Sequence, residues 1–231
     1  MIRTLLTVVA LALPTVPPLA QETPLTQEPS LVQDVGTVTY PAAVYELFTS
    51  QGCSSCPPAN AQITALSDDK DVLALSYGVT YWDYLGWKDT FAKPEFTARQ
   101  RAYVKAMGAK NAYTPQIVVN GESHSSRLRK KAAVRELGKS DRLTLSEAGG
   151  MLRVDGEGDA LLVTYLPGTH SVAVERGENG GRTLELSNVV QDAQTVRLPH
   201  SFAAVPGESY AVIAHGRDLS VASVAVWTRK G

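Results

Sequence analysis

The feature that most constrains this chain is a pair of cysteines directly after an apolar segment. Residues 43–49 carry apolar side chains on both faces of a predicted strand, with Glu46 as the exception. Cys53 and Cys56 follow, and they are the only cysteines among 231 residues. Two thiols at this spacing can form a small disulfide ring, bind a soft metal ion or attack another disulfide. The spacing alone leaves these three chemistries open.

The first half of the chain alternates buried strand patterns with amphipathic helix patterns. Such an order predicts an α/β domain, a mixed sheet flanked by helices. The segment Asn120-Gly121 is a strong signal for a hairpin turn. We expect strands over residues 43–49, 72–77 and 115–119, and helices over residues 57–66, 94–107 and 126–137.

Beyond residue 144 the pattern changes to short strands separated by turns. The predicted strands cover residues 151–154, 160–166, 171–175, 182–186, 195–198, 210–214 and 221–227, and residues 178–181 read as a turn. The length and the 44% hydrophobic content allow two cored domains. We therefore predict an α/β domain over residues 41–143 and a β-rich, sandwich-like domain over residues 144–231.

The N-terminal residues have the layout of a secretory signal. A positive start is followed by an apolar run too short to span a bilayer and by prolines, which predicts a signal peptide over residues 1–20. An uncleaved anchor is the alternative. Residues 21–40 read as a linker with little fixed structure. We expect a periplasmic or secreted protein with no stable membrane span after cleavage, in a compartment that permits disulfides.

The charge balance argues against nucleic acid as a partner. The chain has 22 basic and 23 acidic residues, which gives a formal net charge of −1. Proteins that bind nucleic acid usually carry a basic patch or a strongly positive net charge. The sequence contains no long basic run, so we expect no nucleic acid partner.

Two blocks of the first half resemble glutaredoxin and thioredoxin. Residues 46–56 are similar to the family's strand, turn and redox pair, and residues 113–121 are similar to the block that holds its cis-proline. The resemblance implies a thioredoxin-like fold over about residues 43–137. It also implies that the Thr114–Pro115 peptide bond is cis and lies beside the cysteines.

A more specific resemblance extends over both predicted domains. Residues 51–58, 81–89 and 176–182 are similar to a secreted, thioredoxin-like bacterial family known as domain of unknown function 1223. This family brings no established substrate. The chain departs from active glutaredoxins and thioredoxins in lacking a tryptophan or lysine just before Cys53 and in having Pro57 and Pro58 after Cys56. These departures put glutathione use in doubt.

The main hypothesis from the sequence is thiol–disulfide exchange without a cofactor. A thiolate near a helix N-terminus is stabilised by free amides and by the helix dipole, so Cys53 is placed to attack and Cys56 to resolve. The expected partner is a protein or a small thiol or disulfide. Because prolines have no amide hydrogen, the hydroxyls of Ser54 and Ser55 become important donors.

Other candidate site residues surround this pair. Pro115 is expected to shape a substrate groove, and Thr114, Trp82 and Trp87 to line it, although aromatic clusters often serve only to cover a sheet. Glu46, if buried, would have a raised pKa and relay a proton to or from Cys56. The alternative for Glu46 is a paired or partly exposed carboxylate at the sheet edge.

Two other classes of function remain open on the sequence. The first is a periplasmic metal-binding or chaperone module that uses the same thiols. Two thiolates suit Cu(I) or zinc, with His124 as the nearby imidazole, although a closed zinc site needs four ligands. A lone histidine beside serines is more often a surface residue. In the second alternative, the disulfide is structural and the β-rich half of a non-catalytic binding protein makes the contacts.

Overall fold

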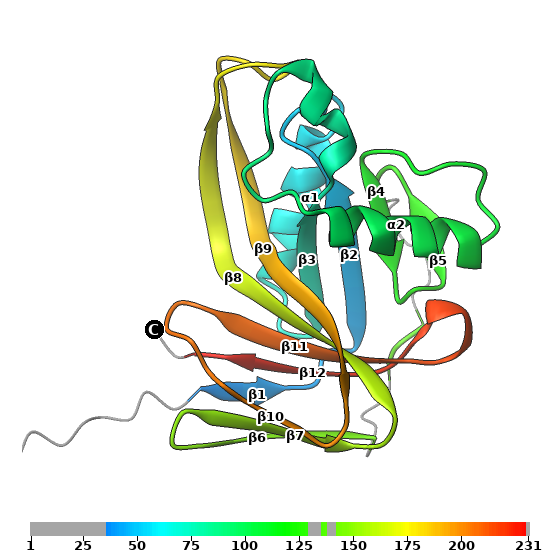
Figure 1. Cartoon of the computed structure of the whole chain (residues 1–231), viewed down its shortest axis with the longest axis vertical. Coiled ribbons are helices and arrows are strands. Elements are labelled where there is room, and N and C mark those ends of the chain that lie inside the picture. Colours follow the sequence, from blue (N-terminus) through cyan, green and yellow to red (C-terminus); the bar gives the residue numbers. More distant parts are fainter. Residues whose placement is uncertain (1–35, 129–134, 138–141, 230–231) are drawn as a thin grey trace, which may run out of the picture. The chain divides into compact units, whose positions relative to one another are not determined.

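The computed structural model describes residues 36–128, 135–137 and 142–229, all of which lie in one compact unit, Gln33–Gly231 (Figure 1). The secondary structure of these residues is mostly strand. The elements are β1 Thr37–Thr39, β2 Ala43–Thr49, α1 Pro57–Ser67, β3 Val72–Gly78, η1 Thr80–Leu85, α2 Pro94–Ala106, β4 Gln116–Val119, β5 Ser123–Ser125, β6 Leu143–Ala148, β7 Met151–Gly156, β8 Asp159–Val174, β9 Arg182–Arg197, β10 His200–Ala203, β11 Ser209–His215, η2 Arg217–Leu219 and β12 Val221–Thr228.

Within the described residues, a mixed sheet of nine strands runs in the order β1-β12-β11-β8-β9-β3-β2-β4-β5. Strands β2 and β3 are parallel, β4 is antiparallel to β2, and β5 is antiparallel to β4. The predicted turn at Asn120-Gly121 connects β4 to β5, and both residues have positive φ, as a tight hairpin turn requires. The expected mixed sheet is therefore confirmed, and few helices accompany it among the described residues.

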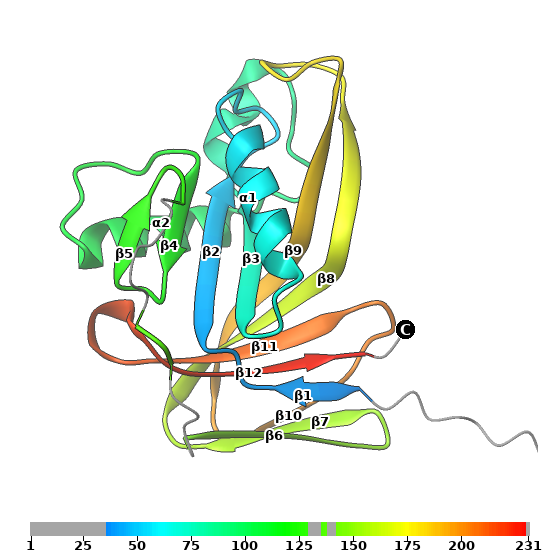
Figure 2. The ribbon, with the colours of Figure 1, turned by 180° about the vertical axis from the view of Figure 1, so that it is seen from behind.

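The side chains of β2 divide between the two faces of the sheet. Leu47 packs with Ala59 and Ile63 of α1, whereas Val44 and Phe48 belong to the larger cluster that includes residues of α2. Figures 1 and 2, seen from opposite sides, show α2 in front of β2 and β3 in one view and α1 in front in the other. Burial on both faces explains why β2 is apolar at almost every position.

Strands β8 and β9 form a long hairpin that connects the two halves of the chain. Each is 16 residues long, and β9 adjoins β3 at Ser76 and Val189. The expected separate strands at 160–166 and 171–175 are one strand, because the residues between them form a register shift rather than a turn. Likewise, residues 182–186 and 195–197 belong to the single strand β9, whereas Leu198 lies just beyond its end.

Strands from both predicted domains thus contribute to one sheet. The division of the chain into a domain over residues 41–143 and a domain over residues 144–231 stays a prediction. A second sheet has the order β10-β7-β6. Its apolar residues join a cluster with residues of β8, β11 and β12, including the fully buried Trp227. The second half is therefore a body built mainly from sheet.

Two predicted segments lie next to residues that the structure does not describe. The first concerns the linker predicted over residues 21–40. Its residues Thr37–Thr39 form strand β1, which pairs with β12, so this part has fixed structure. The helix predicted over 126–137 is wrong at 126–128 and 135–137, where Leu128 donates to the side chain of Gln62 and Leu137 donates to the carbonyl of Ala42. Residues 129–134 and the predicted signal peptide lie outside the described residues. In the part of the chain described, no helix is long and apolar enough to cross a membrane.

Candidate functional site

The site is centred on a disulfide between Cys53 and Cys56 in the loop between β2 and α1. Cys56 is the N-cap of α1, and its carbonyl accepts hydrogen bonds from the amides of Ala59 and Asn60 at 2.9 and 3.1 Å. The Cys56 amide donates to the carbonyl of Cys53 at 3.1 Å, which closes a tight turn. The predicted helix start after the cysteines is therefore confirmed, and the pair is in its oxidised form.

The two cysteine side chains are buried, whereas the two serines between them are exposed. The Ser55 hydroxyl lies 3.3 Å from the sulfur of Cys53 and 3.5 Å from the carbonyl oxygen of Thr114. Ser54 does not take part in this contact, because its hydroxyl donates to Glu178 at 2.7 Å. Of the two predicted hydroxyl donors, the structure places that of Ser55 beside the Cys53 sulfur.

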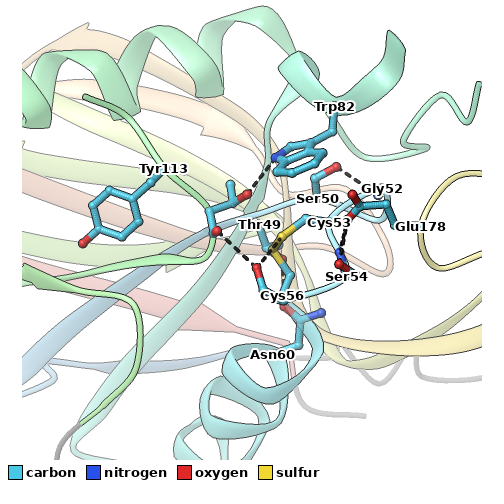
Figure 3. Close-up of a disulfide and its surroundings, with 12 residues drawn as sticks. Thr49, Ser50, Gly52, Cys53, Ser54, Cys56, Asn60, Trp82, Tyr113 and Glu178 are labelled. Atoms are coloured by element: carbon cyan, nitrogen blue, oxygen red, sulfur yellow. Dashed lines mark hydrogen bonds between the residues drawn. A yellow bond between two sulfur atoms is a disulfide. The ribbon is translucent and has the colours of Figure 1, made fainter. Parts of the chain in front are cut away.

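Trp82 lies close to the disulfide (Figure 3), and Thr114 and Pro115 directly follow Tyr113, which is labelled in the same view. The Thr114–Pro115 peptide bond is cis, as predicted, and Pro115 is buried. The indole nitrogen of Trp82 donates to the Thr114 hydroxyl at 2.7 Å. A continuous set of polar contacts therefore runs from Trp82 through Thr114 and Ser55 to the sulfur of Cys53.

Trp87 contacts the residues before the cysteines rather than the disulfide. Its indole nitrogen donates to the side-chain oxygen of Gln51 at 2.8 Å. The side-chain nitrogen of Gln51 in turn donates to the Thr90 hydroxyl at 2.8 Å. The Gln51 backbone amide donates to the carboxylate of Asp89 at 2.7 Å. Burial raises the pKa of Asp89, opposed by the hydrogen bonds from the Gln51 and Phe91 amides. This network fixes the entry to the loop.

The turn between β8 and β9 supplies two residues that the sequence analysis did not assign to the site. The Asn179 side-chain nitrogen donates to the carbonyls of both Gln51 and Cys53 at 2.9 Å. The Glu178 carboxylate accepts from the backbone amide of Ser54 at 3.0 Å and from its hydroxyl. Turn chemistry was sufficient to explain residues 178–181, so only the family resemblance at 176–182 pointed to a role.

Glu46 is buried, but its environment differs from the one expected for a proton relay. Arg99 donates to both carboxylate oxygens at 2.7 and 2.9 Å, and the Tyr103 hydroxyl also donates to Glu46. Burial raises the pKa of Glu46, but the Arg99 guanidinium and these hydrogen bonds outweigh it, so the net direction is downward. The expected raised pKa is therefore wrong, and the alternative of a paired carboxylate describes this residue.

His124 lies on β5, at the edge of the nine-stranded sheet. Its Nδ1 atom is 2.7 Å from the hydroxyl of Tyr113. Among the described residues, no group of three or more histidine, cysteine, aspartate or glutamate side chains is arranged to hold a metal ion. The contact with Tyr113 gives His124 a structural partner within the protein.

Comparison with known proteins places this site in a family. The chain is similar to a protein from Agrobacterium tumefaciens with a known crystal structure, with 28% identity, coverage of 84% of this chain and 96% of that chain, and a TM-score of 0.60. HBP35 of Porphyromonas gingivalis is 13% identical, with coverage of 80% and 74% and a TM-score of 0.49. A comparison with curated proteins gave no match. Residues 44–208 match the model of a family described as "Protein of unknown function (DUF1223)", and the chain therefore belongs to the DUF1223 family.

Proposed function

We propose that this chain is a thiol–disulfide oxidoreductase whose Cys53–Cys56 pair exchanges disulfides with a protein or a small thiol. The observation that carries the proposal is the position of the pair at the N-terminus of α1, with the Ser55 hydroxyl 3.3 Å from the Cys53 sulfur. A helix N-terminus and a hydroxyl donor both stabilise a thiolate, the form of cysteine that attacks disulfides. Such stabilisation makes Cys53 the nucleophile.

The arrangement of the first half supports a thioredoxin-like interpretation of residues 41–143. The parallel pair β2 and β3 is followed along the chain by the antiparallel pair β4 and β5, and α1 and α2 cover opposite faces. The cluster shared by β6, β7 and the strands β8, β11 and β12 supports a sandwich-like interpretation of residues 144–231. In this proposal, the first half carries the chemistry.

The exchange proceeds in two balanced steps. In the reduced protein the Cys53 thiolate attacks a substrate disulfide, forming a mixed disulfide and releasing one substrate sulfur as a thiolate that takes up a proton. The Cys56 thiol then loses its proton and attacks the Cys53 sulfur, which forms the Cys53–Cys56 disulfide and releases the second substrate thiol. Two electrons pass from the protein to the substrate, with one proton from the Cys56 thiol and one from solvent, and the reverse sequence oxidises a substrate dithiol.

Ser55 and Thr114 take complementary roles in this cycle. The single hydrogen of the Ser55 hydroxyl can be directed to the carbonyl of Thr114 or to the sulfur of Cys53. A thiolate is the stronger acceptor because it is charged, so the hydroxyl turns to Cys53 in the reduced protein. The Thr114 carbonyl is then available to a substrate amide, while Trp82 holds the Thr114 side chain and Pro115 forms the wall beside it.

The proposal also places the protein in an oxidising compartment, the periplasm or the exterior of the cell. Cytosolic thiols are kept reduced, whereas exported proteins keep their disulfides. The Cys53–Cys56 disulfide supports this location. N-terminal sequencing of the mature protein checks it: a new start after residue 20 is expected, and a start at Met1 contradicts it.

The test of the function combines a potential with a trapping experiment. Equilibration in graded thiol buffers should give a reduction potential for the pair of roughly −270 to −120 mV, the range of catalytic dithiols. The Cys56→Ser variant should accumulate a mixed disulfide with a model disulfide substrate, and the Cys53→Ser variant should not. Equal trapping by the two variants, or by neither, would overturn the assignment of Cys53 as the nucleophile.

A second candidate, a structural disulfide in a binding protein, is favoured by one observation. Both cysteine side chains have an exposed fraction of 0%, so a partner thiol reaches neither sulfur without movement of the loop. A reduction potential below about −300 mV, which is typical of structural disulfides, would support this candidate and contradict the first.

A further inference from the structure

The tip of the β8–β9 hairpin contacts the disulfide loop from a part of the chain more than a hundred residues away. The contacts Asn179–Cys53 and Glu178–Ser54 join positions separated by 126 and 124 residues. Figure 3 shows Glu178 beside Ser54 and Cys53, on the side of the disulfide away from Tyr113. The disulfide loop is therefore held by Thr114, through Ser55, and by the hairpin, through Ser54 and the carbonyls of Gln51 and Cys53.

We infer that Glu178 and Asn179 are positioning residues of the redox pair: Asn179 holds the loop closed over the disulfide, and Glu178 lowers the stability of a Cys53 thiolate. This inference rests on the proposed exchange function and deepens it. It assigns to the second half of the chain a direct effect on the chemistry of the first half.

Asn179 has the chemistry of a clamp. An asparagine amide offers two N–H donors, and here its nitrogen contacts the carbonyls of Gln51 and Cys53, which bracket Gly52. Its oxygen accepts a hydrogen bond from Arg182 at 3.2 Å. The side chain is buried, so its removal would leave two loop carbonyls without these donors in a place that water enters poorly. Loss of Asn179 should therefore loosen the loop that covers the sulfurs.

Glu178 acts on the charge of the loop. Its carboxylate accepts from the Ser54 amide, and that amide belongs to the residue next to Cys53. The hydrogen bonds from the Ser54 hydroxyl and amide hold the pKa of Glu178 below its ordinary value, so Glu178 is negatively charged at neutral pH. A negative charge near Cys53 disfavours a thiolate there. In addition, the Ser54 amide donates to Glu178 and not to the sulfur of Cys53. The nearest cationic residues in the sequence are Arg176 and Arg182, and Arg182 donates to the side-chain oxygen of Asn179.

Two substitutions of Glu178 separate the effect of charge from that of the hydrogen bond. In the Cys56→Ser background, Glu178→Gln removes the charge but keeps an oxygen that accepts from Ser54, and it should increase the acid dissociation constant of Cys53 roughly threefold. Glu178→Ala also frees the Ser54 amide, and the increase should reach about tenfold. The measurement is titration of thiolate absorbance.

The matched control for these variants is Glu185→Gln. Glu185 is an exposed glutamate of β9 that also accepts from a serine hydroxyl, that of Ser171 at 2.6 Å, but it lies farther along the hairpin from the turn. The control should leave the titration of Cys53 unchanged. If both Glu178 variants titrate like the control, the inferred role of Glu178 is wrong.

The clamp itself is tested by the rate at which a small phosphine reduces the disulfide in the otherwise unaltered chain. Asn179→Ala should accelerate this reduction about tenfold, in line with the loss of about 1.4 kcal/mol of loop closure. Thr183→Ala, an exposed change on the same hairpin, should not. An unchanged rate in folded Asn179→Ala would overturn the clamp. If Asn179→Ala does not fold, the exposed Glu178 variants decide the inference.

These measurements fail separately from the proposed function, because they report the reactivity of the thiols and require no substrate turnover. One combination of results is a changed titration of Cys53 in the Glu178 variants and a changed rate of reduction in Asn179→Ala, with a wild-type reduction potential below about −300 mV. That combination would support the influence of the hairpin and refute the exchange function. A catalytic potential with unshifted variants would retain the function and refute the role of the hairpin.

Discussion

Arg99 of α2 donates hydrogen bonds to both carboxylate oxygens of Glu46 of β2 in the core of the protein. The side chains of the two residues are exposed by only 10% and 1%. Tyr103 also donates to Glu46, and the ring nitrogen Nε2 of His215 lies 3.3 Å from Arg99, so the ion pair joins α2 and β2 to β11. The pair links segments from both halves of the chain.

Replacement of Glu46 by Gln should destabilise the protein strongly. The variant leaves the Arg99 guanidinium buried without its counter-ion, which typically costs about 3 kcal/mol or more. The measurement is the free energy of unfolding in urea. The control, Asp155→Asn, breaks an exposed pair with Arg153 and should change that free energy by less than about 1 kcal/mol. Similar values for the two variants would show that the buried pair contributes little.

His215 should make the protein less stable as the pH falls from about 6.5 to about 4. Burial and the positive charge of Arg99 lower the pKa of His215 from 6.5 to about 4, opposed by Glu46. Between these two values the unfolded chain binds a proton that the folded protein does not, so the free energy of unfolding falls with falling pH. The full effect is at most roughly 3 kcal/mol.

Glu46 affects the free energy of unfolding at lower pH than His215 does. Its pKa is below the ordinary 4.5 in the folded protein, so its stabilisation is present above about 4.5 and is lost as the pH falls through its folded value. A His215→Gln variant should therefore have a flatter stability profile between pH 4 and 6.5 and retain the loss below it. Parallel profiles of variant and wild type across that window would contradict the assignment.

Ser55 and Ser54 should differ in their effect on Cys53. In the Cys56→Ser background, Ser55→Ala should raise the pKa of the Cys53 thiol by about one unit, because the thiolate loses a hydroxyl donor. Ser54→Ala should have a smaller effect, since that hydroxyl donates to Glu178. Titration of thiolate absorbance distinguishes the two. A larger shift for Ser54→Ala would mean that the loop rearranges on reduction.

Asp89→Ala should destabilise the protein, because Asp89 accepts a hydrogen bond from Gln51 at the start of the disulfide loop. The Asp89 carboxylate accepts from the amides of Gln51 and Phe91 at 2.7 and 2.9 Å, and the residue is 4% exposed. Removal of this acceptor should lower the free energy of unfolding by about 2 kcal/mol. Asp159→Ala, which breaks an exposed pair with Arg197, serves as the control and should change it by about 0.5 kcal/mol or less. Equal losses would contradict a structural role for Asp89.

The parts of the structure that the sequence predicted are those set by local patterns. Strands β2 and β3 are continuous apolar runs, the helix after Cys56 begins with two prolines, and Asn120-Gly121 is a turn dipeptide. Each of these signals acts within a few residues of its own position. The cis Thr114–Pro115 bond and its place beside the cysteines were expected for another reason, the resemblance of two blocks to glutaredoxin and thioredoxin.

What the sequence did not predict depends on contacts between distant residues. Arg99 stands in a helix full of polar side chains, and nothing in its neighbours indicates that it pairs with Glu46. Pro167-Gly168 is a dipeptide that typically ends a strand, but here it forms an irregularity within β8. Asn179 is an ordinary turn residue by its local sequence, and its two donors to the loop become visible only when residues 126 positions apart are brought together.

The contribution of the hairpin also determines when the environment of the cysteines is complete. During synthesis from the N-terminus, Cys53 and Cys56 emerge well before Asn179 does, because Asn179 lies 123 positions after Cys56. A disulfide formed at that stage would lie in a loop that lacks the two hydrogen bonds from Asn179. It becomes covered only when β8 and β9 have been added, so the order of translation separates the making of this bond from its protection.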